Sequence, residues 1–261
     1  MTRCVGHRGA AALAPENTLA AFRAGMAAGV DAVECDVHCS RDGQLVLMHD
    51  ADVSRTTDGS GSIGGMDLAE LQRLNCAARF GDGTYASQRI VTLVELLALA
   101  RGNCGVQIEI KVPEGVPYAG IEAQVVDALH EHGAFDAAQV ICFDAATLSR
   151  IRALAPSLTL GFLASRASLP TRLQNDPAGL AAQALACGAE FLSLDRQFVA
   201  PQHRLATRER GLGLAVWTVN DPRDMQQYIR EGVDAITSDR PDLLRQVLGE
   251  QTRHEIRLTE Q

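Results

Sequence analysis

Short apolar runs recur along the chain and alternate with segments of helical pattern. Three joints between them share one arrangement: a helix-like segment ends near a glycine, an apolar run follows, and an aspartate closes it. These joints are residues 27–36, 186–195 and 230–239. Glycine after a helix is typical of the left-handed C-cap, so each joint predicts a helix followed by a strand. The repeat indicates a βα architecture.

The segments between the apolar runs have helical periodicity. In residues 17–29, 121–133 and 222–232, apolar side chains recur at spacings of three and four. We expect eight parallel strands, near residues 4–7, 32–36, 106–111, 140–143, 159–163, 191–194, 214–219 and 235–237. This pattern predicts an α/β fold, a TIM (β/α)8 barrel. An open doubly wound sheet is the alternative, but no glycine-rich dinucleotide loop follows an early strand.

The second strand differs from the others because no helix follows it. The chain runs on to an Asp-Gly pair and returns as an apolar run. Asp-Gly between apolar runs favours a two-residue hairpin loop, here residues 42–43. That loop would make Arg41 and Gln44 the first pair of the hairpin. Asp36 would then lie opposite His49.

Residues 51–88 do not fit the repeat. They are rich in glycine, serine and threonine, with one short helix expected near residues 68–74. Because so few of them are apolar, they could not form a core of their own. We interpret them as an insertion or cap after the hairpin of strand two. The chain of 261 residues is then one catalytic barrel domain, 1–249, with a C-terminal tail, 250–261.

Charge and cysteine content limit the classes of partner and the cellular compartment that the sequence allows. The net charge of -8, with no cluster of lysine and arginine, argues against a nucleic-acid partner. No apolar run approaches the length of a membrane span, and the N-terminus has no signal-peptide pattern. The seven cysteines include no CxxC pair, which favours buried thiols in a reducing compartment. We therefore expect a cytoplasmic protein with no stable membrane association; the oligomeric state stays open.

Three carboxylates fall at the ends of expected strands. Side chains alternate along a strand, so Glu34 and Asp36 share one face, and Glu109 lies on the next barrel strand. In such a barrel the carboxyl ends of the strands form one mouth. Oxygen ligands alone suit one hard divalent cation, Mg²⁺ or Ca²⁺. The alternative is an ion network with Arg8 and Lys111, although three acids leave negative charge that a cation would offset.

Other polar residues at the same mouth suit phosphoester chemistry. His7 and His49 are candidate acid and base, because histidine titrates near neutral pH. Arg8 and Lys111 suit a phosphate group. Trp217, near the end of strand seven, either packs in the core or lies against the carbon skeleton of a substrate.

Six segments together resemble the glycerophosphodiester phosphodiesterase family. They are GHRGAAALAPENT (6–18), ECDVHCSRDGQLVLMHD (34–50), RTTDGSGSI (55–63), EIK (109–111), WTVN (217–220) and GVDAITSDRP (232–241). Each motif alone would be weak, but the set in this order is specific. Because no signal-peptide pattern is seen, the chain resembles the cytosolic bacterial branch of the family. The family itself is similar to phosphatidylinositol-specific phospholipases C.

The resemblance implies a TIM barrel that hydrolyses glycerophosphodiesters, such as glycerophosphocholine or glycerophosphoethanolamine, to sn-glycerol 3-phosphate and an alcohol. It also implies the roles of the site residues. Glu34, Asp36 and Glu109 would bind a divalent metal, and His7 and His49 would act as acid and base. Arg8 and Lys111 would bind the phosphate, and Glu16 and Asn17 of the PENT motif would line or brace the site.

Two mechanisms and two other functions stay open at this point. Likeness to the phospholipases suggests that the glycerol 2-hydroxyl attacks first and forms a cyclic phosphate; direct attack by water is the alternative. A lysophospholipase D-like activity would need an apolar groove, which residues 51–88 could cover. A non-catalytic phosphodiester-binding barrel would be expected to lack an essential residue, and all of them are present.

Overall fold

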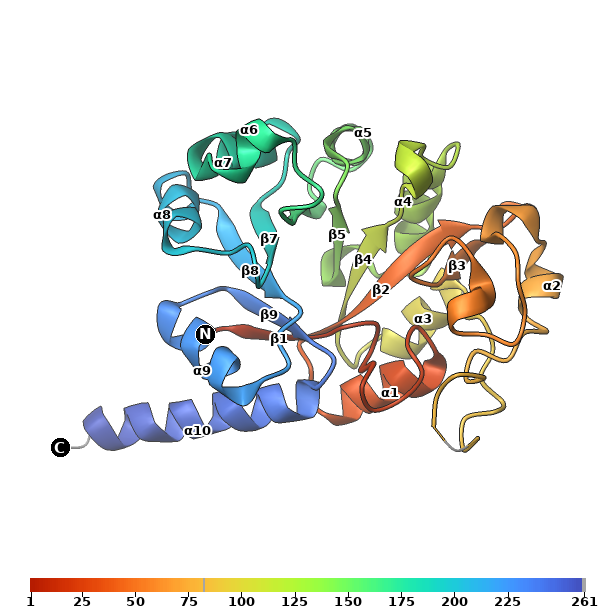
Figure 1. Cartoon of the computed structure of the whole chain (residues 1–261), viewed down its shortest axis with the longest axis horizontal. Helices are drawn as coiled ribbons and strands as arrows, with labels where there is room; N and C mark the ends of the chain where they lie inside the picture. Colours follow the sequence, from red (N-terminus) through yellow and green to blue (C-terminus); the bar gives the residue numbers. More distant parts are fainter. Residues whose placement is uncertain (82, 260–261) are drawn as a thin grey trace.

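Eight parallel strands close into a barrel in this computed structural model, which describes residues 1–81 and 83–259, with side chains as far as Glu250 (Figure 1). The barrel strands are β1 (Arg3–Gly6), β2 (Ala32–Cys39), β4 (Gly105–Ile110), β5 (Ala138–Cys142), β6 (Thr159–Ala164), β7 (Phe191–Asp195), β8 (Gly213–Trp217) and β9 (Ala235–Ser238). They lie in the order β1-β9-β8-β7-β6-β5-β4-β2, and β1 also pairs with β2. The predicted TIM barrel is therefore confirmed.

Helices surround the barrel (Figure 1). They are α1 (Leu19–Ala27), α3 (Leu93–Ala100), α4 (Ile121–Glu131), α5 (Ala145–Leu154), α6 (Thr171–Gln174), α7 (Pro177–Ala186), α8 (Pro201–Glu209), α9 (Pro222–Glu231) and α10 (Pro241–Thr259), with short 3₁₀ turns η3 (Pro113–Gly115) and η4 (Phe135–Ala137). Residues 250–259, expected as a tail, continue α10, and residues 260–261 lie outside the described part. Within that part, no helix is both long and apolar enough to span a bilayer.

The core lies between the strands and the helices. Side chains of β2 that point outward, such as Val33 and Cys35, are fully buried with Phe22 of α1. Glycines at the three predicted joints follow α1, α7 and α9 with φ of +79°, +83° and +75°. Left-handed backbone of this kind ends a helix and turns the chain toward the next strand, as predicted. The seven cysteines are unpaired, and all except Cys104 are buried.

The hairpin after β2 has a different register from the one predicted. β3 (Leu45–Leu47) runs antiparallel to β2, and Val37 pairs with Leu47. The backbone N–H of Met48 donates to the carbonyl of Asp36 at 3.0 Å. Asp36 therefore lies opposite Met48, and the predicted pairing of Asp36 with His49 was wrong by one residue.

The loop of this hairpin has three residues, 41–43. Ser40 closes it, because its N–H donates to the Gln44 carbonyl at 2.9 Å and its carbonyl accepts from Gly43 N at 3.0 Å. A two-residue loop of type I′ needs positive φ at both of its residues. Of the two, only Gly43 has it, with φ of +80°. Three-residue loops need a single left-handed residue, which explains the longer loop.

Residues 51–88 lie beside β2 and β3 and contain η1 (Val53–Arg55), η2 (Ile63–Gly65) and α2 (Leu68–Leu71) (Figure 1). The short helix predicted near 68–74 is thus present as α2. Buried apolar side chains from this segment and its flanks form a small second cluster: Val46, Met48, Val53, Ile63, Leu71, Cys76 and Ile90. Because two members belong to β3 and the residue after it, the segment packs onto the hairpin.

Candidate active site

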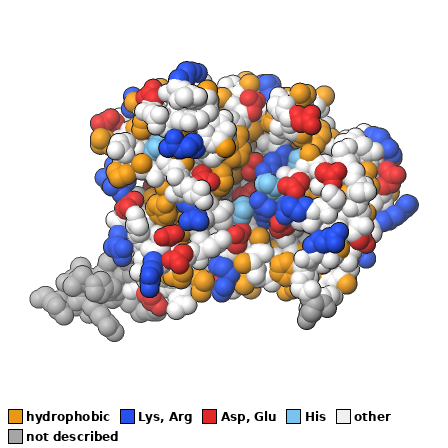
Figure 2. All heavy atoms as spheres, in the orientation of Figure 1, with side chains coloured by type: hydrophobic (Ala, Val, Ile, Leu, Met, Phe, Trp, Pro, Cys, Tyr) orange, Lys and Arg blue, Asp and Glu red, His pale blue; other side chains and the backbone are white. Residues whose placement is uncertain are grey.

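The carboxyl ends of the barrel strands surround one cavity. Figure 2 shows histidine and cationic side chains gathered in a hollow of this face, next to hydrophobic ones. Charged residues form one wall, and Ile141, Phe143, Leu163 and Trp217 contribute an apolar wall. A cavity with these two walls suits a small ligand that has an anionic part and a carbon-rich part.

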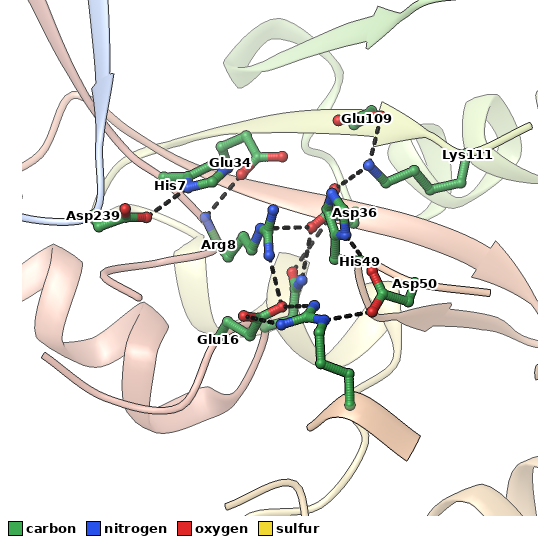
Figure 3. A network of polar contacts seen from close by, with 12 residues as sticks. His7, Arg8, Glu16, Glu34, Asp36, His49, Asp50, Glu109, Lys111 and Asp239 are labelled. Carbon is green, nitrogen blue, oxygen red and sulfur yellow. Dashed lines mark hydrogen bonds and ion pairs between the residues drawn. The ribbon is translucent and has the colours of Figure 1, made fainter. Parts of the chain in front are cut away.

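Three buried acids lie together at the charged wall (Figure 3). Glu34 and Asp36 alternate along β2, and the register of β2 with β4 places Glu109 beside Asp36. Their exposed fractions are 3%, 1% and 9%. One oxygen from each lies within 4.8 Å of the others, so the three carboxylates could hold a metal ion. The predicted ligand set is thus brought together.

Asp36 is paired with cationic and amide groups. Lys111 Nζ lies 2.7 Å from Asp36 Oδ1 and 2.6 Å from Glu109 Oε1, and Arg8 Nε lies 3.5 Å from Asp36 Oδ2. Burial alone would raise the pKa of Asp36, but the charges of Lys111 and Arg8 outweigh it and hold that pKa well below its usual value. Burial would lower the pKa of Lys111, but the charges of Asp36 and Glu109 outweigh it and raise that pKa.

Glu34 is different, because none of the described lysine or arginine side chains forms an ion pair with it. Its Oε2 accepts from the backbone N–H of Arg8 at 2.8 Å. Burial, together with the charge of Asp36, raises the pKa of Glu34 to about 8. An ion network with Arg8 and Lys111 therefore accounts for Asp36 and Glu109 but leaves Glu34 uncompensated. Oxygen donors in this arrangement fit a hard divalent cation.

His7 follows β1 and is oriented by the end of β9. Its Nδ1 lies 2.6 Å from Asp239 Oδ1, and Asn220 Nδ2 donates to the other oxygen of that carboxylate at 2.6 Å. Burial would lower the pKa of His7, but the bond to Asp239 and the charge of Glu34 outweigh it and raise that pKa. An ionised carboxylate only accepts, so Nδ1 carries the proton and Nε2 is left for another partner.

His49, one residue beyond the partner of Asp36, also lines the cavity and is held by a carboxylate. Its Nδ1 lies 2.5 Å from Asp50 Oδ1 (Figure 3). Burial, together with the nearby charge of Lys111, lowers the pKa of His49. The cavity therefore has two histidines, each bound by a carboxylate and with pKa values shifted in opposite directions, an arrangement typical of acid and base pairs.

Trp217 contributes to the apolar wall. Its Nε1 donates to the carbonyl of Ser193 at 3.0 Å, and the ring meets Phe143 edge-on, with centroids 5.7 Å apart. The indole N–H is therefore satisfied by the barrel, while the ring borders the cavity. Trp217 thus both packs against Phe143 and borders the cavity, and its contact with the carbon skeleton of a ligand stays a prediction.

Glu16 and Asn17 lie in the loop between β1 and α1 and brace the charged wall. Glu16 Oε1 accepts from a terminal nitrogen of Arg8 at 2.8 Å, and Asn17 Nδ2 donates to Asp36 Oδ2 at 2.8 Å. Neither residue is among those that line the cavity. Glu16 and Asn17 therefore lie in bracing positions, the second of the two predicted alternatives.

Comparisons with known proteins identify the family of this chain. The sequence model of the glycerophosphoryl diester phosphodiesterase family matches residues 7–243. The chain belongs to this family. A glycerophosphodiester phosphodiesterase from Caldanaerobacter subterraneus is 32% identical over 93% of this chain and 96% of its own.

Solved structures of similar phosphodiesterases have the same fold. A phosphodiesterase from Oleispira antarctica, in complex with the product sn-glycerol-3-phosphate, superposes with a TM-score of 0.84 at 29% identity and covers 95% of this chain and 97% of that one. A glycerophosphodiester phosphodiesterase from Agrobacterium tumefaciens gives 0.78 at 28% identity, over 94% and 99%. The present chain is accordingly a phosphoric diester hydrolase.

In this phosphodiesterase, three residues next to the site were not predicted from the sequence. Asp50 and Asp239 hold the two histidines, and Arg55 joins Asp50 to Glu16. A signal existed for two of them. Asp50 directly follows His49, and Asp239 closes the third helix–strand joint at the same mouth. Arg55 opens the motif RTTDGSGSI, but nothing in that motif indicates its contacts, which depend on how residues 51–88 pack.

Proposed function

We propose that this phosphodiesterase hydrolyses glycerophosphodiesters to sn-glycerol 3-phosphate and an alcohol, with one Mg²⁺ or Ca²⁺ ion on Glu34, Asp36 and Glu109. The observation that carries the proposal is the arrangement around the cavity. Two carboxylate-bound histidines lie beside a buried acidic triad of which one member, Glu34, has no cationic partner among the described side chains. The product bound to the Oleispira relative supports this substrate class.

The cavity suits both parts of such a substrate. Arg8 and Lys111 line it and supply positive charge for the phosphate, and the buried Nε of Arg8 makes no hydrogen bond in the described structure. A bound divalent cation would add charge stabilisation for the phosphate oxygens. Phe143 and Trp217, on the apolar wall, would contact the glycerol carbons. The substrate would thus lie with its phosphate toward β2 and β4.

His7 and His49 would transfer the protons. With Nδ1 of each ring held by a carboxylate, Nε2 remains for the substrate. One histidine deprotonates the nucleophile, and the other protonates the departing alcohol. We favour the glycerol 2-hydroxyl as first nucleophile over water: its attack on phosphorus releases the alcohol and leaves a cyclic phosphate, which a water molecule then opens to sn-glycerol 3-phosphate. A diester that lacks this hydroxyl but turns over at the normal rate would exclude the cyclic route.

The structure favours small diesters over a lysophospholipid. An acyl chain would need an apolar groove, for which residues 51–88 were the candidate cover. The apolar side chains of that segment, such as Val53, Ile63 and Leu71, are instead fully buried in the second cluster. We therefore propose diesters such as glycerophosphocholine as substrates.

The test is release of sn-glycerol 3-phosphate from glycerophosphocholine, with and without EDTA, by wild type, His49→Ala and His130→Ala. His130 is the matched control, because it is exposed at the end of α4, a helix that runs away from the mouth. We expect His49→Ala to lose about 10²- to 10⁴-fold in rate and His130→Ala to keep the wild-type rate. Full activity of His49→Ala, or of metal-free protein verified by elemental analysis, would contradict the proposal.

A further inference from the structure

Arg55 connects two carboxylates on different parts of the chain. It is the last residue of η1, in segment 51–88. Its Nε donates to Asp50 Oδ2, and its two terminal nitrogens donate to the oxygens of Glu16 at 2.7 and 3.0 Å. The planar guanidinium matches a carboxylate with two parallel bonds, which fixes the relative orientation of the groups. One side chain thus joins the residue after His49 to the loop between β1 and α1.

Each of these carboxylates also holds a residue of the candidate site. Asp50 accepts from His49 Nδ1 through the oxygen that Arg55 does not use, at 2.5 Å. Glu16 accepts from Arg8 at 2.8 Å. Arg55 itself is not among the residues that line the cavity. The hydrogen bonds of Arg55 therefore connect it to the site through Asp50 and Glu16.

The backbone that presents Arg55 is fixed by packing. Val53, two residues earlier, is fully buried in the second apolar cluster. Asp52 caps the turn, because its Oδ1 accepts from Ser54 N at 2.8 Å. The hydroxyl of Thr57 donates to the carbonyl of Val53 at 2.8 Å. With its backbone held at both ends of η1, Arg55 loses less conformational freedom when it binds the two acids.

We propose that Arg55 is a positioning residue that fixes His49 through Asp50 and Arg8 through Glu16. The acid/base group and the phosphate-binding group then keep a constant separation, set from outside the cavity by segment 51–88. This inference rests on the proposed function for the roles of His49 and Arg8. It predicts that the segment contributes to turnover although none of its described residues lines the cavity.

The test compares Arg55→Met and Arg55→Lys with Arg41→Met. Arg41 is a close control, because it also joins the hairpin to segment 51–88 through a two-pronged contact, with Asp67 at 2.8 and 2.7 Å. The Arg41 and Arg55 side chains are 51% and 46% exposed. None of the recorded contacts of Arg41 reaches a residue of the site. kcat and KM for glycerophosphocholine and the melting temperature would be measured for each variant.

We expect Arg55→Met to lower kcat about 10- to 100-fold and to raise KM, because both the histidine and the arginine lose a fixed partner. Arg41→Met should keep both constants within about twofold, at a similar change in melting temperature. Arg55→Lys should recover little, since an ammonium lacks the planar fork that binds both acids. Arg55→Met with the kinetic constants of Arg41→Met would overturn the inference.

A combined variant tests whether Arg55 acts through its partners. In the Glu16→Gln, Asp50→Asn background, adding Arg55→Met should cost less than about threefold more in kcat, because the connection is already broken. An undiminished further loss would mean that Arg55 acts directly, which contradicts a positioning role.

Nitrogen NMR of the His49 imidazole separates this inference from the proposed function. The Nδ1 signal should change in Arg55→Met and stay at its wild-type position in Arg41→Met, whether or not the protein turns over. An inactive wild type would contradict the proposed function alone. An unchanged His49 signal in Arg55→Met would overturn the positioning role even in an active enzyme.

Discussion

His7 Nδ1 lies 2.6 Å from Asp239 Oδ1, although the two residues are 232 positions apart in the sequence. The contact exists because β1 pairs with β9, which brings the ends of both strands to the same side of the mouth. Asn220 donates to the second oxygen of Asp239 and so fixes the orientation of the carboxylate. The ring of His7 is thereby held as a single tautomer, with Nε2 toward its other side.

Asp239→Asn should impair turnover through His7. An amide can place its NH₂ toward Nδ1, which reverses the tautomer and turns the proton-bearing nitrogen toward the substrate. We expect a loss of about 10²-fold or more in kcat, because the same change in a serine protease triad costs about 10⁴-fold. The pKa of His7 should also fall, since the carboxylate stabilises the imidazolium. The limb of the pH–rate profile that reports His7 should therefore move to lower pH.

Asp242→Asn is the control for this change. Asp242 lies three residues away and pairs with Arg240 through both of its oxygens, with no recorded contact to either histidine. Its pH–rate profile should match that of wild type. A profile of Asp239→Asn that is unshifted, with unchanged kcat, would rule out a role for the Asp239–His7 pair.

The sequence was sufficient for the eight barrel strands because each is a largely apolar run bounded by glycine, proline or polar residues, signals that are local. Predicted and observed strands differ by at most three residues at either end. The register of the hairpin could not be obtained in the same way. Asp-Gly fits loops of two or three residues, and the choice depended on Ser40 bonding to both Gly43 and Gln44.

The site residues could be predicted from the sequence only where a residue type is unusual for its position. Glu34 and Asp36 are conspicuous because carboxylates are costly inside a strand. Arg55 is not, because an arginine in a polar segment is ordinarily exposed. Its contacts with Asp50 and Glu16 depend on the buried side chain of Val53, and thus on packing that no local pattern specifies.

Glu34→Gln should stabilise the metal-free protein, and it should abolish the activity that the enzyme has with metal added. The substitution removes a buried carboxyl group that has no cationic partner among the described side chains, and the cost of ionising that group in the folded protein is reflected in its raised pKa of about 8. We expect a gain on the order of 1–3 kcal/mol, or a few degrees in melting temperature. Added Mg²⁺ or Ca²⁺ should raise the melting temperature of wild type but not of this variant.

Asp36→Asn provides the contrast. Asp36 is paired with Lys111 and Arg8, so its loss leaves two partly buried cations without their shared partner. We expect a melting temperature below that of wild type and a free energy of unfolding lower by on the order of 3 kcal/mol. If both variants shifted stability in the same direction, the distinction between a compensated Asp36 and an uncompensated Glu34 would be wrong.

His203 should make stability depend on pH far from the site. It is buried in α8, and its Nδ1 accepts from the backbone N–H of Ala200 at 3.1 Å, so the folded ring is neutral. Burial, together with the charge of Arg166, lowers its pKa. As pH falls below about 6.5, the unfolded chain binds a proton that the folded state does not, so the free energy of unfolding decreases, by at most about 1.4 kcal/mol per pH unit.

Urea unfolding between pH 7 and pH 5 would measure this effect. His203→Gln should show a smaller decrease of the free energy of unfolding than wild type, while His130→Gln, at an exposed position, should follow wild type. Curves for wild type and His203→Gln that stay parallel over this range would show that folding does not lower the pKa of His203.

His38 should support His49 from the backbone side. It is buried on the same face of β2 as Asp36, and its Nε2 lies 3.2 Å from the carbonyl of His49. A carbonyl only accepts, so Nε2 carries the proton, and the hydroxyl of Tyr118 donates to Nδ1 at 2.9 Å. Burial lowers the pKa of His38 to about 4, which keeps the ring neutral and this pattern of donors intact.

Replacing His38 should therefore slow turnover without removing a group that lines the cavity. His38→Leu leaves the His49 carbonyl and the Tyr118 hydroxyl without partners, and we expect kcat to fall about tenfold with little change in KM. His38→Gln can still donate to that carbonyl and should recover most of the rate. Tyr118→Phe removes only the outer bond, so its effect should be smaller than that of His38→Leu. An equal loss in His38→Gln and His38→Leu would show that ring packing, and not the bond to His49, is what the site requires.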